Sequence, residues 1–184
     1  MAPEVGKIAA VLSDDDRATQ VLLAAMVADW HHSGAKIAGV IGELHGLPER
    51  TCGAGFLRDI ASRKAYRIYL EASPHQNSCH LDAAGVANVC KVILDQISMT
   101  DLVVLNKFGK LERAGEGLAA AFELAISAGK PLLTSVSDRH RDAWRTFAPD
   151  TSFLAANTAA LQNWWRAVRV PRHPDGPHAH SDRG

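Results

Sequence analysis

The stretch DLVVLNKFGKLE, residues 101–112, places polar and charged side chains directly after an apolar run. Such a run is typical of a buried strand, and in many nucleotide hydrolases the strand ends in carboxylates that hold Mg²⁺ and activate water. Here the run ends in Asn106 and Lys107. Asn106 still offers a neutral oxygen, but a lysine ammonium cannot act as the base that activates water. Because Lys110 adds a second positive charge, the pattern favours anion binding over cation binding.

Three interpretations of Asn106 and Lys107 are open. The lysine can pair with the aspartates Asp14–Asp16 of an earlier loop, it can bind an anion together with Asn106, or a rebuilt site can keep some nucleotide hydrolysis. The site that we predict takes the second interpretation, with no catalytic residue and no resident metal. Mg²⁺ is expected only if the ligand is a nucleotide.

The segment SDDDRAT, residues 13–19, lies where a phosphate-binding P-loop would join a strand to a helix. A P-loop needs glycines, so that backbone N–H groups turn toward phosphate, and a lysine that neutralises the charge. This segment has neither, and Asp14–Asp16 repel a triphosphate. The aspartates are typical of a helix N-cap, with a divalent-metal role as the alternative. Arg17 and Thr19 are the candidates to replace, weakly, the lysine and the hydroxyl of a P-loop.

Two further segments carry candidate ligand-binding residues. SVSDRHRDAW offers Ser135, Ser137 and Arg139 between an apolar run and a helical pattern, a combination that suits phosphate, molybdate or sulfate. Capping by Ser137 or the next residue is the simpler alternative for that serine. NSCHLD contains Cys79 and His80, which are soft ligands, although structural roles or a ligand-facing loop explain them equally well.

Alternating apolar runs and helical patterns position these residues and predict an α/β fold with a mainly parallel sheet. Ligands of such sheets sit beyond the carboxyl ends of the strands, which selects the loops after residues 13, 42, 106 and 135. We expect one domain over residues 1–170 and a disordered, histidine-rich tail over 171–184. The predicted strands are 7–13, 36–42, 101–107 and 131–136, with a hairpin in 56–70 and an edge strand in 151–156. The predicted helices are 17–34, 81–99, 117–129, 139–148 and 157–169.

Composition narrows the function classes. The 184 residues carry a formal net charge of zero, so we expect no nucleic-acid partner. No apolar run reaches the roughly 18 residues that span a membrane, and three cysteines in no paired spacing are typical of a reduced protein. These features predict a cytoplasmic location without membrane insertion.

The order of these motifs resembles the bacterial domain-of-unknown-function 2478 family over about residues 7–166, most specifically in NKFGKLE, CHLD and the closing WW. That family is similar to the thermophile-type nucleoside-triphosphatases, which implies a three-layer P-loop nucleoside-triphosphatase-like fold. The resemblance also implies degenerate Walker motifs. Those enzymes have a glycine-rich loop where this chain has residues 13–19, and they have Asp-Glu where this chain has Asn106 and Lys107. Family neighbourhoods concerned with molybdenum suggest an accessory role in molybdenum metabolism.

The combined prediction is a non-hydrolysing binding protein for a small anion, either an oxoanion such as molybdate or a nucleotide or phosphate. A nucleoside-triphosphatase with a rebuilt active site is the alternative. A homodimer is a further hypothesis: Trp164 and Trp165 are adjacent, so we expect one in the core and the other in a contact between two copies.

Overall fold

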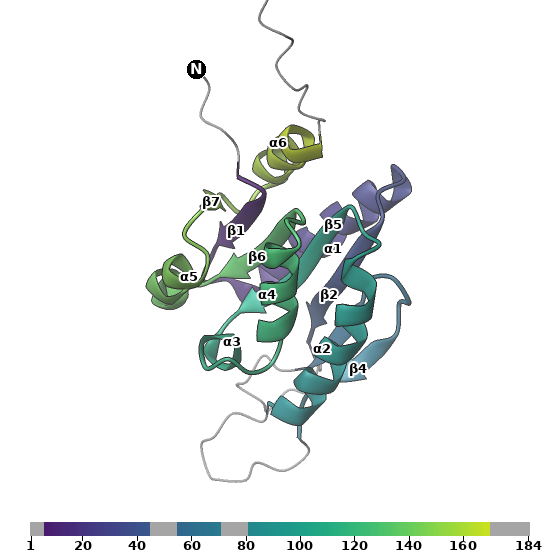
Figure 1. Cartoon of the computed structure of the whole chain (residues 1–184), viewed down its shortest axis with the longest axis vertical. Helices are drawn as coiled ribbons and strands as arrows, with labels where there is room; N and C mark the ends of the chain where they lie inside the picture. Colours follow the sequence, from purple (N-terminus) through teal and green to yellow (C-terminus); the bar gives the residue numbers. More distant parts are fainter. Residues whose placement is uncertain (1–5, 45–54, 71–80, 170–184) are drawn as a thin grey trace, which may run out of the picture.

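The strands of the chain form one twisted sheet, with the two ends of the described chain close to its upper edge in Figure 1. The computed structural model describes residues 6–44, 55–70 and 81–169. Within these ranges seven strands form a single sheet in the order β4-β3-β2-β5-β6-β1-β7. Their bounds are β1 Ile8–Leu12, β2 Ile37–Glu43, β3 Phe56–Asp59, β4 Ala65–Arg67, β5 Leu102–Phe108, β6 Leu132–Val136 and β7 Thr151–Leu154.

Most of the described strand pairs are parallel. β2 pairs with β5, β5 with β6, β6 with β1, and β1 with β7, all in the parallel sense. β3 and β4 form an antiparallel hairpin, and β3 adds to β2 in the antiparallel sense. The prediction of a mainly parallel sheet with an added hairpin is confirmed, and β7 lies at an edge as expected.

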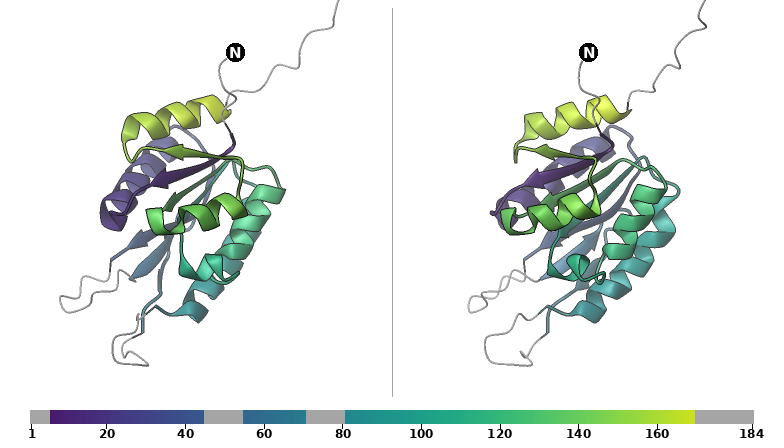
Figure 2. Two further views of the ribbon diagram at one scale, coloured as in Figure 1. Left: turned by 90° about the vertical axis from the view of Figure 1, so that its left-hand side faces the viewer. Right: turned by 60° about the vertical axis from the view of Figure 1, so that its left-hand side comes forward.

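Helices cover both faces of the sheet. α2, α4 and α5 contribute to the core on one face, and α1 and α6 to the core on the other, as Figures 1 and 2 show from three directions. This is the predicted three-layer, P-loop nucleoside-triphosphatase-like α/β architecture. The helix bounds are α1 Asp16–His32, α2 Ala83–Ile97, α3 Lys110–Arg113, α4 Ala119–Ser127, α5 Arg141–Phe147 and α6 Thr158–Arg169.

The hydrophobic cores on the two faces of the sheet explain why the strand sequences are continuous apolar runs. In β1, Ala10 packs in the core beneath α2 and α4, while its neighbours Ala9 and Val11 pack in the core beneath α1. Successive side chains of a strand point to opposite faces, so a sheet covered on both faces needs apolar residues at every position.

Two segments near the carboxyl edge differ from the sequence prediction. The helix expected at 139–148 begins only at Arg141, after a 3-10 turn over Asp138–His140. Ser137 occupies the N-cap position of that turn, as the capping alternative expects, but its side chain makes no capping hydrogen bond. The short helix α3 was not predicted, because four residues after Gly109 are too few for a periodic pattern.

Both adjacent tryptophans are core residues. Trp164 is 3 % exposed and Trp165 is 4 % exposed. The Trp164 indole N–H donates to the Gly6 carbonyl at 3.0 Å, and the Trp165 ring lies 5.6 Å from that of Trp30 in α1. The expectation that one of them contacts a second copy is therefore wrong, because α6 packs against both α1 and the chain that enters β1.

No helix in the described ranges is both long and apolar enough to cross a membrane. The tail over 171–184 lies outside the described residues, so its predicted disorder stays a prediction.

Candidate functional site

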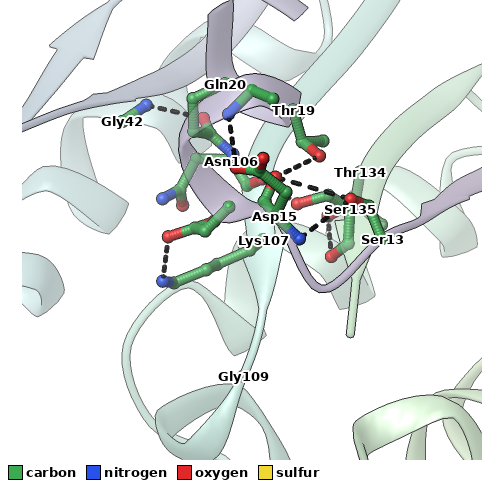
Figure 3. Close-up of polar contacts among 12 residues, drawn as sticks. Ser13, Asp15, Thr19, Gln20, Gly42, Asn106, Lys107, Gly109, Thr134 and Ser135 are labelled. Atoms are coloured by element: carbon green, nitrogen blue, oxygen red, sulfur yellow. Dashed lines mark hydrogen bonds and ion pairs between the residues drawn. The ribbon is translucent and has the colours of Figure 1, made fainter. Parts of the chain in front are cut away.

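The carboxyl ends of β1, β5 and β6 bring most of the predicted site residues to one edge of the sheet (Figure 3). The three strands are parallel neighbours, so the loops that follow them meet. The β1–α1 loop contributes Asp14 and Asp15, β5 ends near Asn106 and Lys107, and β6 contains Ser135.

The main-chain oxygen of Asn106 is the centre of a buried hydrogen-bond network. It accepts from Gln20 Nε2 at 2.8 Å and from Ser135 Oγ at 2.7 Å. Gln20 Oε1 in turn accepts from the Gly42 N–H at 2.9 Å. Gln20 thereby joins α1 to β2 and β5, and the Ser135 hydroxyl joins β5 to β6. The network fixes the backbone from which the Asn106 and Lys107 side chains project.

The Asn106 side chain is held without a protein partner. Asn106 is 9 % exposed, and within the described ranges its amide makes no hydrogen bond. A Cβ built on Gly42 would lie 3.1 Å from Asn106 Nδ2, so the amide sits against the end of β2. The Asn106 amide atoms are not among the described side-chain atoms that are fully buried without a partner, so a water or a ligand can reach them.

The β1–α1 loop satisfies its own backbone groups. Asp15 caps α1, since its Oδ1 accepts from the Ala18 N–H at 2.9 Å, and Ser13 Oγ accepts from the Asp15 N–H at 3.1 Å. The N-cap interpretation of the aspartate triplet is confirmed for Asp15. Thr19 is 1 % exposed and its hydroxyl donates to the Asp15 carbonyl at 2.7 Å. The hydroxyl is therefore bonded to the backbone one turn earlier. Arg17 is exposed and forms no ion pair with the described residues.

The other two aspartates reach across to neighbouring loops. Lys107 Nζ donates to Asp16 Oδ2 at 2.7 Å, and the two side chains are 47 % and 43 % exposed. Asp14 Oδ1 accepts from the Asp138 N–H at 3.0 Å. Pairing between Lys107 and the triplet, one of the three interpretations of that lysine, is therefore observed.

Positive charge gathers around His140, the last residue of the 3-10 turn. His140 Nδ1 is buried and has no hydrogen-bond partner in the part of the chain that the structure describes. Burial of the imidazole is the largest cause of a lowered pKa at His140. The charges of Arg139, Arg113 and Lys107 lower the pKa of His140 further. Three cations from three different elements therefore act on one imidazole at the carboxyl edge.

The remaining candidates are more peripheral. Lys110 is exposed at the start of α3, and Ser137 is half-buried, with its carbonyl accepting from the His140 N–H at 3.0 Å. Cys79 and His80 lie outside the described residues. Among the described residues no group of three or more His, Cys, Asp or Glu side chains is arranged to hold a metal ion.

Sequence reasoning missed three residues that shape this edge. Gln20 looked like one more polar residue of a helix, and Arg113 lay in an unpredicted helix. Glu112 is 7 % exposed, and its carboxylate accepts from the Gly109 N–H and from the Leu118 N–H, each at 3.0 Å. It thus closes the loop after β5. The signal available for Glu112 was its place three residues after Gly109, the spacing of a capping carboxylate.

Comparison with known proteins gives one family and one named relative. Residues 8–164 match the family described as "Protein of unknown function (DUF2478)". The chain is also 30 % identical over 163 residues to the protein named "Molybdenum import ATP-binding protein ModC 2" of Bradyrhizobium diazoefficiens. That alignment covers 87 % of this chain but only 18 % of the relative, so the chain spans less than a fifth of that protein. No solved structure matches. Since the family match takes in nearly all of the described fold, the chain belongs to the DUF2478 family.

Proposed function

We propose that this protein is a non-hydrolysing α/β domain that binds a small anion at the carboxyl edge of its sheet. The observation that carries the proposal is Lys107, an exposed lysine at the carboxyl end of β5 whose charge, with those of Arg113 and Arg139, lowers the pKa of His140. An anion bound at this edge would offset the positive charge that Lys107, Arg113 and Arg139 exert on His140. The unpartnered amide of Asn106 supplies a donor and an acceptor beside the same strand end.

The first loop supports a site that differs from a P-loop. In a P-loop the backbone N–H groups at the start of the helix bind phosphate. Here the N–H groups of Ala18 and Asp15 are taken by the side chains of Asp15 and Ser13. Two of the donors around the start of α1 are therefore occupied, and the segment carries three carboxylates that repel a triphosphate, so we place the anion beside β5 and β6.

The end of β5 supports binding without hydrolysis. Nucleotide hydrolysis of the P-loop kind needs a carboxylate for Mg²⁺ and a group that orients the attacking water. Asn106 is neutral and Lys107 is cationic, and a cation at this position repels Mg²⁺. An anion held here would be bound and positioned but not cleaved.

The relative's name suggests which anions to test. That protein is called a molybdenum-import and ATP-binding protein, and the matched part is a small share of it. Molybdate and ATP are therefore candidate ligands of this chain, alongside sulfate and phosphate. An accessory role in molybdenum metabolism, in the cytoplasm, is part of the proposal.

Thermal denaturation with each anion tests the proposal. A ligand at 100 times its Kd that binds only the native state stabilises it by about 2.7 kcal/mol. The melting temperature is measured with sulfate, phosphate, molybdate, tungstate or ATP, each with and without Mg²⁺. We expect anions that bind the site to raise the melting temperature and the others to leave it unchanged. Lys107→Met should abolish the rise, whereas Lys91→Met, which removes an exposed charge from α2, should leave it intact.

Two results separate binding from the alternatives. The ion pair of Lys107 is about half exposed, so its loss should lower the free energy of unfolding of the ligand-free protein by only about 0–1 kcal/mol. Unaltered stabilisation of Lys107→Met by an anion would remove this residue from the site. Release of phosphate from ATP in the presence of Mg²⁺ would favour the alternative, a nucleoside-triphosphatase with a rebuilt active site. The relative's name, which includes ATP binding, is the reason to test that alternative.

A further inference from the structure

Asp14, Asp15 and Asp16, at the junction of the β1–α1 loop with α1, each accept a hydrogen bond from a donor that could otherwise bind an anion. Asp14 accepts from the Asp138 N–H at the start of the 3-10 turn, and Asp15 accepts from the Ala18 N–H at the start of α1. Asp16 accepts from the Lys107 ammonium. The chain's own carboxylates thus stand where the oxygens of an external anion would otherwise bind.

The contact of Asp16 differs from the other two in being a pair of opposite charges. Asp15 caps its own helix, and Asp14 accepts from a neutral backbone N–H. Asp16, by contrast, neutralises a cation on β5 while both side chains stay close to half exposed. An ion pair with this much solvent access is weak and can exchange with an anion from solution.

We propose that Asp16 is a built-in competitor for the anion site, which holds Lys107 until an external anion displaces its carboxylate. This inference rests on the proposed function. It adds that Asp16 lowers the affinity of the site for anions. In the free protein Lys107 is paired with Asp16, and in the bound protein it pairs with the ligand. Every anion must displace the Asp16 carboxylate, so each binds modestly more weakly than it would without this competitor.

The Asp16→Asn variant isolates the effect of the charge. Asparagine keeps the size of the side chain and an oxygen that can accept from Lys107, but it removes the negative charge. Titration of the variant with orthophosphate, molybdate and ATP should give dissociation constants about two- to fivefold lower than those of the wild type, the range expected for losing an exposed ion pair. Asp95→Asn is the matched control, since it removes the same charge from an exposed site near the end of α2.

A double variant tests whether Asp16 acts through Lys107. If it does, Asp16→Asn combined with Lys107→Met should bind no better than Lys107→Met alone. An equal gain in both backgrounds would mean a general charge effect and would overturn the inference. Circular dichroism of each variant checks that the overall helix content is unchanged.

The same titrations keep the two proposals apart. If the wild type binds one of these anions and Asp16→Asn behaves like Asp95→Asn, the competitor role fails while the anion site stands. If neither the wild type nor Asp16→Asn binds any of them, the proposed function fails and the inference fails with it. Tighter binding by Asp16→Asn than by both the wild type and Asp95→Asn would support the inference.

Discussion

The surroundings of His140 predict a pH-dependent stability below neutral pH. Its pKa is lowered in the folded chain by burial and by Arg139, Arg113 and Lys107. The unfolded chain, in which histidine titrates near about 6.5, then binds the proton first as the pH falls. Stability therefore rises with pH through this window and is independent of His140 above it. We expect the free energy of unfolding to decline as the pH is lowered from about 7 to 5.

Urea denaturation of His140→Gln at several pH values checks this expectation. The variant should lose part of the decline between about pH 7 and 5 and should match the wild type in slope above it. Arg139→Gln removes one Coulombic cause while keeping the imidazole, so its decline should be smaller than that of the wild type. An unchanged slope in His140→Gln would show that other groups cause the pH dependence.

The residues that sequence could identify are those whose position in a pattern carried meaning. Lys107 stood out because it ends an apolar strand where a nucleotide hydrolase would place a carboxylate. Its partner Asp16 was one of three aspartates named for that pairing, and the sequence could not choose among them. Gln20 was not found, because a long-range hydrogen bond to a backbone group leaves no periodic signal. Glu112 was missed although its spacing from Gly109 is that of a capping carboxylate.

At the scale of elements, β2 contains a glycine whose backbone conformation leaves no room for a side chain next to β5. Gly39 has φ +124°, and a Cβ built on it would lie 1.8 Å from the Val104 carbonyl oxygen of β5. Backbone cannot yield as the end of a flexible side chain can. We expect Gly39→Ala to lower the free energy of unfolding by about 3 kcal/mol or more, with separation of β2 from β5.

Gly34→Ala is the matched control for Gly39→Ala. Gly34 also has a positive φ, +91°, but a Cβ there would meet nothing within 4 Å. Backbone strain alone should cost about 1–2 kcal/mol. Urea denaturation of both variants separates strain from collision, and equal losses would mean that Val104 is not the obstacle.

Elements were predictable where one local signal was strong. Buried strands such as β5 showed as continuous apolar runs, and the hairpin showed as two runs around a polar turn. α3 and the 3-10 turn before α5 were not predictable, because each is shorter than the window in which a helical period can be recognised. Both lie at the carboxyl edge, so the loops that build the candidate site were the least predictable part of the chain.

At the scale of the whole molecule, the order of strands in the sheet is what sequence could not supply. Chain order places β5 after the hairpin, yet in space it lies between β2 and β6. Local patterns carry no information on which strands pair, because pairing is decided by how the helices cover both faces. The sheet order nevertheless determines which loops meet, since the ends of β5 and β6, which lead to Lys107 and to Arg139, are parallel neighbours.

The same order predicts how stability is distributed over the molecule. β5 has a paired strand on each side, and its residues Leu102, Val103, Val104 and Leu105 are fully buried. β4 and β7 lie at the edges, with β7 half-buried throughout and β4 largely exposed. In native-state hydrogen exchange the amides of β5 should exchange only on global unfolding, whereas those of β4 and β7 should exchange through smaller openings with lower free energies. Exchange from β7 as slow as that from β5 would contradict this sheet order, because an outer strand paired on one side cannot be as well protected as a central one.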